Sequence, residues 1–154
     1  YRLNTKCLLK IIYTCAQTKA EIVKQDELES GTRALLNFGH TFGHAIEASK
    51  KYHGILHGEA ISIGMNIASA ISADLDYLSH DEYCHIEETL KLLKLPTLVP
   101  RGVKSSELIK HINHDKKKID GKNRLILLKK KGQGFIKEGI ETKYLKDISK
   151  NFIC

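Results

Sequence analysis

The sequence lacks the features that would place it in a membrane or a secretion pathway. No apolar run is long enough to span a bilayer. The first residues show no basic segment followed by an apolar one and a small-residue cleavage site, so no secretory signal is expected. The chain also begins with Tyr1 inside helix-like sequence. These features predict a piece of a longer cytoplasmic protein.

Paired cysteines, internal repeats and low-complexity linkers are missing as well. The four cysteines are scattered, and none belongs to a Cys-x-x-Cys pair. This spacing favours reduced thiols over a disulfide framework. A length of 154 residues suits one ordinary domain. We therefore expect a single domain over residues 1–154.

Basic charge is scarce in the first two-thirds of the chain and abundant in the last third. Residues 101–154 carry 15 Lys and Arg against 6 Asp and Glu, whereas residues 1–100 are slightly acidic. A nucleic-acid surface would interleave arginine or aromatic side chains with the lysines, and this segment does not. The lysine runs therefore indicate a solvated face and no nucleic-acid partner.

The hydrophobic pattern predicts a mainly α protein with one short hairpin. Six segments are expected to be helical, and the period changes to that of strands around Gly132. Ser30 and Thr32 are candidate N-caps for the second helix, which should run through the histidines. Helices are expected over residues 3–25, 81–93 and 142–152, with a short one from 105 to about 112. The second helix should include Leu35 and the histidines, and the third should begin at His57 and include Ile71. The expected strands cover 124–128 and 135–137.

Four histidines fall within eighteen positions, among glycines and two carboxylates. On a helix the spacing places His40 and His44 on one face, with Glu47 one turn further. His57 opens the next helix, so both helices could direct a ring into one cavity. Histidine is the commonest protein ligand of catalytic transition metals. The four-residue spacing of Gly39 and Gly43 indicates that another backbone or a ligand comes close.

The residues alone leave the third ligand of such a site open. Candidates are His44, Glu47, Glu59 or a residue outside this segment, because catalytic zinc has three protein ligands and an open position. The simpler alternative is that these are capping or surface histidines. His53 lies in a polar loop and is expected to be solvent-exposed. The remaining histidines are expected on the surface: His80, His85, His111 and His114.

A guanidinium and an amide precede the first histidine at helical spacing. Arg33, Asn37 and His40 would share one helical face. Guanidinium binds carboxylate or phosphate in a two-point fork, so this face suits an anionic, hydroxylated substrate. Alone, Arg33 would more simply form an ion pair with Glu29. The sequence Asp115-Lys116-Lys117 would alone indicate only a polar turn.

Taken together, these motifs resemble the signature of the 3-dehydroquinate synthase family. The resemblance is carried by the run from Arg33 to Ala48 and by Leu56-His57-Gly58-Glu59-Ala60. It extends to Lys19-Ala20-Glu21-Ile22-Val23 and to Asp115-Lys116-Lys117. It implies the multihelical C-terminal domain of the dehydroquinate-synthase-like fold.

The resemblance also implies a reaction and its cofactors. The family converts 3-deoxy-D-arabino-heptulosonate 7-phosphate to 3-dehydroquinate and phosphate, in the shikimate pathway to aromatic amino acids. It is a carbon–oxygen lyase that uses NAD+ catalytically and a divalent metal, zinc or cobalt. Its members are usually homodimers.

Site residues follow from the resemblance by matching positions. His40 and His57 resemble the two histidine metal ligands, and His44 resembles the histidine that contacts substrate. The expected contacts to the substrate's anionic groups are Lys19, Arg33, Asn37 and Lys117, or Lys116 in its place. Glu29 matches an active-site carboxylate.

Two parts of the family pattern have no counterpart in this sequence. We find neither the upstream segment that supplies the glutamate ligand nor the glycine-rich, NAD-binding N-terminal domain. The fragment alone is therefore expected to be inactive. The alternatives are another sugar phosphate cyclase that makes an inosose or a valiolone, a metal-dependent polyol dehydrogenase, and a non-catalytic helical remnant.

Overall fold

The computed structural model describes residues 4–28, 31–116 and 123–153, and the side chains of 115 and 116 are excluded. Contacts within the chain divide it into two compact units, Tyr1–Leu36 and Asn37–Cys154. None of the helices in the described part combines the length and apolar content that a membrane span requires. The described cysteines are free thiols.

The first unit consists mainly of one long helix. Helix α1 covers Thr5–Gln25, as the periodicity predicts, and begins where the Asn4 side chain accepts a hydrogen bond from the Lys6 N–H at 3.0 Å. The 3-10 helix η1 covers Thr32–Asn37. It is held at its start by the Asp26 carboxylate, which accepts hydrogen bonds from the N–H groups of Gly31 and Arg33 at 2.8 and 2.9 Å.

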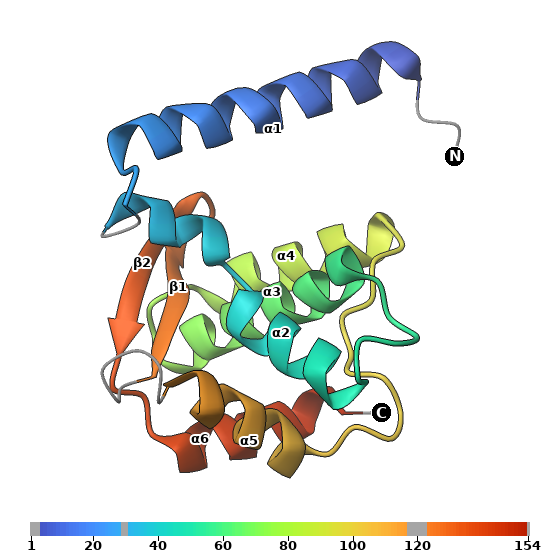
Figure 1. Ribbon diagram of the computed structural model, residues 1–154, viewed down its shortest axis with the longest axis vertical. Coiled ribbons are helices and arrows are strands. Elements are labelled where there is room, and N and C mark those ends of the chain that lie inside the picture. Colours follow the sequence, from blue (N-terminus) through green and yellow to red (C-terminus); the bar gives the residue numbers. More distant parts are fainter. Residues whose placement is uncertain (1–3, 29–30, 117–122, 154) are drawn as a thin grey trace. The chain divides into compact units, whose positions relative to one another are not determined.

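The second unit is built around helix α3, His57–Asp74. Helices α2 (His40–Ser49) and α4 (His80–Leu92) both pack against α3, and α5 (Ser105–Lys116) packs against α2 (Figure 1). Ten residues of α3 are buried, as its nearly all-round apolar sequence from Ala60 to Ile71 indicates. The largest fully buried core side chains belong to Phe42, Ile46, Ile63, Ile67, Ile71, Leu108, Leu125, Leu127 and Leu145.

A two-stranded hairpin and a short helix complete this unit. Strands β1 (Arg124–Lys130) and β2 (Gln133–Glu138) are antiparallel, and β1 packs on α3. Helix α6 covers Thr142–Ser149 and continues into the 3-10 turn η2, Lys150–Phe152. The Val99 N–H donates to the Phe152 carbonyl at 2.7 Å, which fastens the end of the chain to the loop after α4. The predicted hairpin and final helix are confirmed.

One predicted element is wrong. The second helix was expected to run unbroken through the histidines, but η1 ends at Asn37 and α2 begins only at His40. Gly39 separates them with a φ of 82°, a left-handed conformation that interrupts a right-handed helix. Arg33 and His40 therefore do not share a helical face. Ser30, the other candidate cap, lies outside the described residues.

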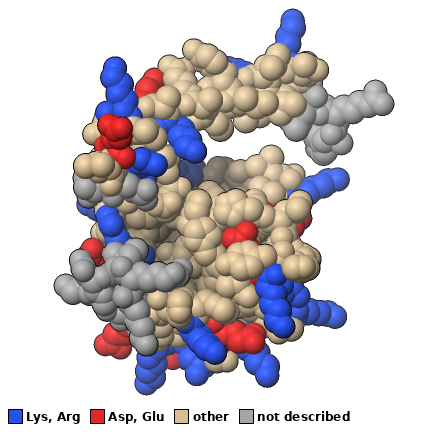
Figure 2. Space-filling view, viewed as in Figure 1, with Lys and Arg blue, Asp and Glu red and all other residues tan. Residues whose placement is uncertain are grey.

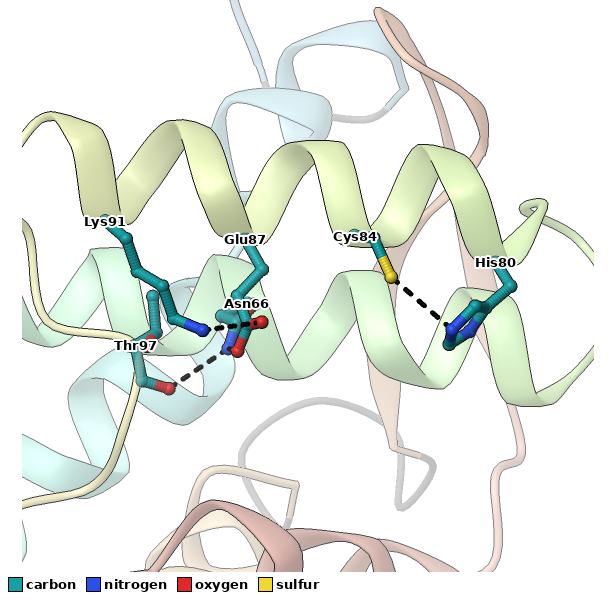
Figure 3. A network of polar contacts seen from close by, with 6 residues as sticks. All are labelled: Asn66, His80, Cys84, Glu87, Lys91 and Thr97. Atoms are coloured by element: carbon teal, nitrogen blue, oxygen red, sulfur yellow. Dashed lines mark hydrogen bonds and ion pairs between the residues drawn. The ribbon is translucent and has the colours of Figure 1, made fainter.

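Buried polar contacts fasten the loop after α4 to the central helix. Asn66 Nδ2 donates to the Thr97 carbonyl at 3.1 Å (Figure 3). Ser62 Oγ donates to the Pro96 carbonyl at 2.9 Å. On α4 itself, Lys91 pairs with Glu87 at 2.8 Å. The bonds of Asn66 and Ser62 hold the loop after α4 against the helix that begins with His57.

Within the second unit, the Lys and Arg side chains drawn in Figure 2 lie mostly toward the edge of the face, with acidic groups among them. Lys129, Lys130 and Lys131 at the hairpin turn are all exposed. This distribution agrees with the solvated face that the sequence predicts.

Candidate metal centre

Three glycines place helix α2 directly on the backbone of α3. A Cβ atom added to Gly39 would lie 2.6 Å from the Met65 nitrogen, and one added to Gly43 would lie 2.6 Å from Ile61 Cδ1. A Cβ at Gly64 would overlap the Gly39 carbonyl oxygen. The close approach that the glycine spacing predicts is therefore made by another backbone. It brings the first turn of α2 to the first turns of α3.

This crossing gathers three imidazoles. The ring centroids of His40 and His44 lie 5.3 Å apart, those of His40 and His57 lie 5.7 Å apart, and those of His44 and His57 lie 6.0 Å apart. His40 is half-buried, while His44 and His57 are exposed. The predicted convergence of His40 and His57 is thus present in the structure.

Two of the rings are held by hydrogen bonds at Nδ1. His40 Nδ1 lies 3.3 Å from the Phe38 carbonyl oxygen, and His57 Nδ1 lies 3.0 Å from Glu47 Oε1. A carbonyl can only accept, so Nδ1 of His40 carries the proton in this bond. The Nε2 atom of the neutral ring then keeps a lone pair available for a metal.

The electrostatic surroundings favour a neutral His40. Burial lowers the pKa of His40, and the neighbouring His44 and His57 rings lower it further. The hydrogen bond to Phe38 and the charge of Glu47 act in the opposite direction on the same pKa. Metal ligation requires the neutral imidazole, so the lowered pKa extends the pH range in which this ring can bind.

The donor set fits a transition metal such as zinc. Ligand atoms of His44, Glu47 and His57 all lie within 4.8 Å of one another. Two ligands of one zinc ion, each at about 2.1 Å, can be no more than about 4.2 Å apart, so small side-chain rotations suffice to close the site. Imidazole and carboxylate together are a usual zinc donor set.

Glu59, a candidate for the third metal ligand, is instead hydrogen-bonded at the start of α3. Its carboxylate accepts a hydrogen bond from the Leu56 N–H at 2.9 Å. It thereby satisfies a backbone donor at the start of α3, as in a capping box. Glu47 and His44 remain the nearer candidates within this part of the chain.

A pocket of about 510 Å³ adjoins the histidines and is lined by residues of α2, the following turn and α5. His44 and Glu47 form one side of it, and His111 and His114 on α5 contribute to its wall. The last two were expected on the surface, and His114 is exposed there. Their spacing of three residues was the available signal, because it puts both on one face of a helix. Which partner that face meets depends on the packing of α5 against α2.

The other predicted site residues are distributed differently. Lys19 is exposed on α1, and Arg33 is half-buried in η1, where its Nη1 donates to the Glu27 carbonyl at 2.6 Å. Both belong to the first unit, whereas the histidines belong to the second. Asn37 is exposed at the end of η1. Glu29, Lys117 and the side chain of Lys116 lie outside the described residues.

The chain matches one family of known proteins over most of its length. The model of the 3-dehydroquinate synthase C-terminal family matches residues 1–118. Among curated relatives named 3-dehydroquinate synthase, the protein of Colwellia psychrerythraea is 43% identical over 141 residues, covering 92% of this chain and 40% of the relative. That of Haemophilus ducreyi is 44% identical over 135 residues, covering 88% and 37%. The chain spans about 40% of the length of these relatives.

Two solved structures of synthases have a similar fold. A 2-epi-5-epi-valiolone synthase from Streptomyces hygroscopicus, with NAD+ and Zn2+ bound, matches with a TM-score of 0.83 at 21% identity, over 96% of this chain and 40% of that one. A 2-deoxy-scyllo-inosose synthase, complexed with carbaglucose-6-phosphate, NAD+ and Co2+, matches with a TM-score of 0.82 at 23% identity, over 97% and 42%. These likenesses confirm the predicted fold class.

Proposed function

The chain belongs to the 3-dehydroquinate synthase C-terminal family, and from this premise we propose that it is the metal- and substrate-binding part of a 3-dehydroquinate synthase. The reaction would convert 3-deoxy-D-arabino-heptulosonate 7-phosphate to 3-dehydroquinate and phosphate. The observation that carries this proposal is the convergence of His40, His44 and His57 where α2 crosses α3.

We propose that His40 and His57 bind the metal. Their rings lie 5.7 Å apart, and each has Nδ1 engaged by an oxygen atom of the protein, which leaves both Nε2 atoms for an ion. When bound, zinc or cobalt would polarise a substrate oxygen as a Lewis acid. NAD+ would supply the hydride exchange, and no residue of this chain is assigned to holding it.

His44 is proposed to contact substrate instead of metal. Its ring centroid lies 5.3 Å from that of His40 and 6.0 Å from that of His57, and the residue lines the pocket of about 510 Å³. That volume suits a sugar phosphate, since small-molecule sites commonly measure about 300–1,000 Å³. Its exposed imidazole can donate to or accept from a substrate hydroxyl.

The remaining roles rest on the family resemblance. We propose Lys19, Arg33 and Asn37 as contacts to the substrate's anionic groups, with Glu29 as an active-site carboxylate. Lys117, or Lys116 in its place, would contact phosphate. We also propose that the enzyme is a cytoplasmic homodimer whose NAD-binding domain is separate from residues 1–154.

A product assay on the complete gene product tests the proposal. With NAD+, zinc and the heptulosonate phosphate, we expect phosphate release and 3-dehydroquinate, identified by NMR. His57→Ala should reduce bound zinc and turnover by at least about tenfold, whereas His53→Ala should change neither. His53 is a matched control because it is exposed in the loop before α3. An inosose or valiolone product would identify another sugar phosphate cyclase.

The 154-residue chain alone should give no turnover. It spans about 40% of its relatives' length, and two histidine ligands without a third should hold zinc weakly. Dehydroquinate formation by this chain with added NAD+ and zinc would contradict that expectation.

A further inference from the structure

We propose that Glu47 is a positioning residue, which fixes the orientation and tautomer of His57 so that its Nε2 faces the metal. This inference rests on the proposed function in that it requires a metal at His57. It assigns to Glu47 a task distinct from direct ligation.

The contact between the two side chains has the geometry of a supporting hydrogen bond. Glu47 Oε1 lies 3.0 Å from His57 Nδ1. An ionised carboxylate can only accept, so Nδ1 must donate, and the lone pair of the neutral ring lies on Nε2. Histidines that bind metals commonly donate their second ring N–H to a carboxylate or a backbone carbonyl.

Burial is unequal across this contact, and the inequality indicates which partner positions the other. The Glu47 side chain is only 13% exposed, whereas that of His57 is 59% exposed. Glu47 follows the buried residues Ala45 and Ile46 on α2, while His57 is the first residue of α3. The carboxylate is therefore the anchored group, and the exposed ring takes its orientation from it.

The other proposed ligand is held in the same way by a different group. His40 Nδ1 faces the Phe38 carbonyl at 3.3 Å, which likewise leaves Nε2 free. In both His40 and His57, Nδ1 is hydrogen-bonded and Nε2 is left available. Binding of one metal ion by the two Nε2 atoms accounts for this shared arrangement.

Direct ligation by Glu47 is the competing arrangement. The Glu47 carboxylate lies within 4.8 Å of ligand atoms of both His44 and His57. If Glu47 and the nitrogen nearest to it both bound one ion, His57 would use Nδ1, and its Nε2 would carry the proton. The two arrangements therefore differ in which nitrogen of His57 the metal contacts.

NMR of ¹⁵N-histidine-labelled protein separates them, on the complete gene product at about pH 8, where an ordinary imidazole is neutral. We expect His57 to carry its proton on Nδ1 without metal and to show the zinc-induced shift at Nε2. Glu47→Ala should abolish the Nδ1 preference and weaken zinc binding by about 10–100-fold. Glu47→Gln keeps an acceptor oxygen and should lose less zinc affinity than Glu47→Ala. Glu88→Gln, an exposed carboxylate on α4, should change neither property.

A zinc-induced shift at Nδ1, or equal losses of zinc affinity in Glu47→Gln and Glu47→Ala, would overturn the positioning role. An unchanged His57 tautomer in Glu47→Ala would overturn it as well. If these results were as expected but no dehydroquinate formed, the proposed function would fail while the assignment of Glu47 stood. The tautomer measurement needs neither NAD+ nor turnover, so the two failures are distinguishable.

Discussion

At the scale of single residues, the site depends on three glycines, which have no Cβ atom. Gly39, Gly43 and Gly64 let two backbones approach more closely than Cβ atoms would allow. The sequence predicts the close approach, because glycines four apart are costly in a helix without such a reason. It does not predict Gly64, which belongs to the partner helix and lies more than twenty residues further along the chain.

Replacing Gly64 with alanine should therefore damage both stability and site. The new Cβ would overlap the Gly39 carbonyl and lie 2.9 Å from the Gly43 nitrogen, and backbone atoms cannot move aside cheaply. We expect a loss of about 1–3 kcal/mol in the free energy of unfolding, measured with urea. Zinc affinity should fall as well, because the displaced α2 would move His40 away from His57.

Gly58→Ala is the matched control on the same helix. No atom lies within 4 Å of a Cβ at Gly58, so this change should be neutral or stabilise by up to about 1 kcal/mol through helix propensity. Equal urea midpoints for the two variants would show that the helix crossing tolerates a Cβ.

At the scale of elements, α3 organises the second unit through small buried polar side chains. Ser62 and Asn66 bond to carbonyls of the loop after α4, and Ser72 Oγ accepts from the Leu128 N–H of β1 at 3.0 Å. The apolar pattern predicts a buried central helix. It does not show that these polar residues are tethers, since their partners lie more than thirty residues away.

Asn66→Ala should release one such tether. The Thr97 carbonyl would lose its donor in a buried position, which should cost about 1–3 kcal/mol of unfolding free energy. Ser69→Ala is the control, because Ser69 Oγ donates to the Met65 carbonyl of its own helix at 2.8 Å. Urea unfolding measures both, and a Ser69→Ala variant as unstable as Asn66→Ala would contradict the tether.

Helix α6 is joined to the end of α3 by a tyrosine. Tyr144 Oη donates to Asp74 Oδ2 at 2.7 Å, and burial together with this carboxylate raises the pKa of Tyr144. Tyr144→Phe should cost about 1 kcal/mol near neutral pH. Tyr52→Phe, at a side chain that is 74% exposed, should cost nothing measurable in the same urea titration.

The raised pKa of Tyr144 also gives a pH dependence of known sign. Above about pH 10 the unfolded tyrosine loses its proton while the folded one keeps it, so the unfolded state binds fewer protons and stability falls as pH rises. The stability difference between wild type and Tyr144→Phe should therefore be complete below about pH 10 and shrink above it. A difference that grew with pH would contradict the hydrogen bond to Asp74.

At the scale of the whole molecule, local pattern predicted the elements better than the site. Helix and strand periods are set by near neighbours, so five helices and the hairpin were recovered. The break at Gly39 was missed, because a glycine signals either a cap or a close contact and here does both. His111 and His114 were missed as pocket residues because only the packing of α5 on α2 brings them to His44.

The distribution of the core predicts which end of the chain can be removed. In the part of the chain that the structure describes, the buried residues of the main hydrophobic cluster run from Phe42 to Phe152, so residues 37–154 include them. We expect cooperative thermal unfolding within about 5 °C of residues 1–154, measured by calorimetry.

The opposite truncation, residues 1–149, removes only five residues but should be far more harmful. It deletes buried Phe152 and the carbonyl that accepts from the Val99 N–H. Losing a buried phenylalanine costs about 3–5 kcal/mol, and the freed N–H adds to that cost. Removing thirty-six residues should therefore destabilise this protein less than removing five. The reverse order of midpoints would show that residues 1–36 are needed for the stability of the part that carries the histidines.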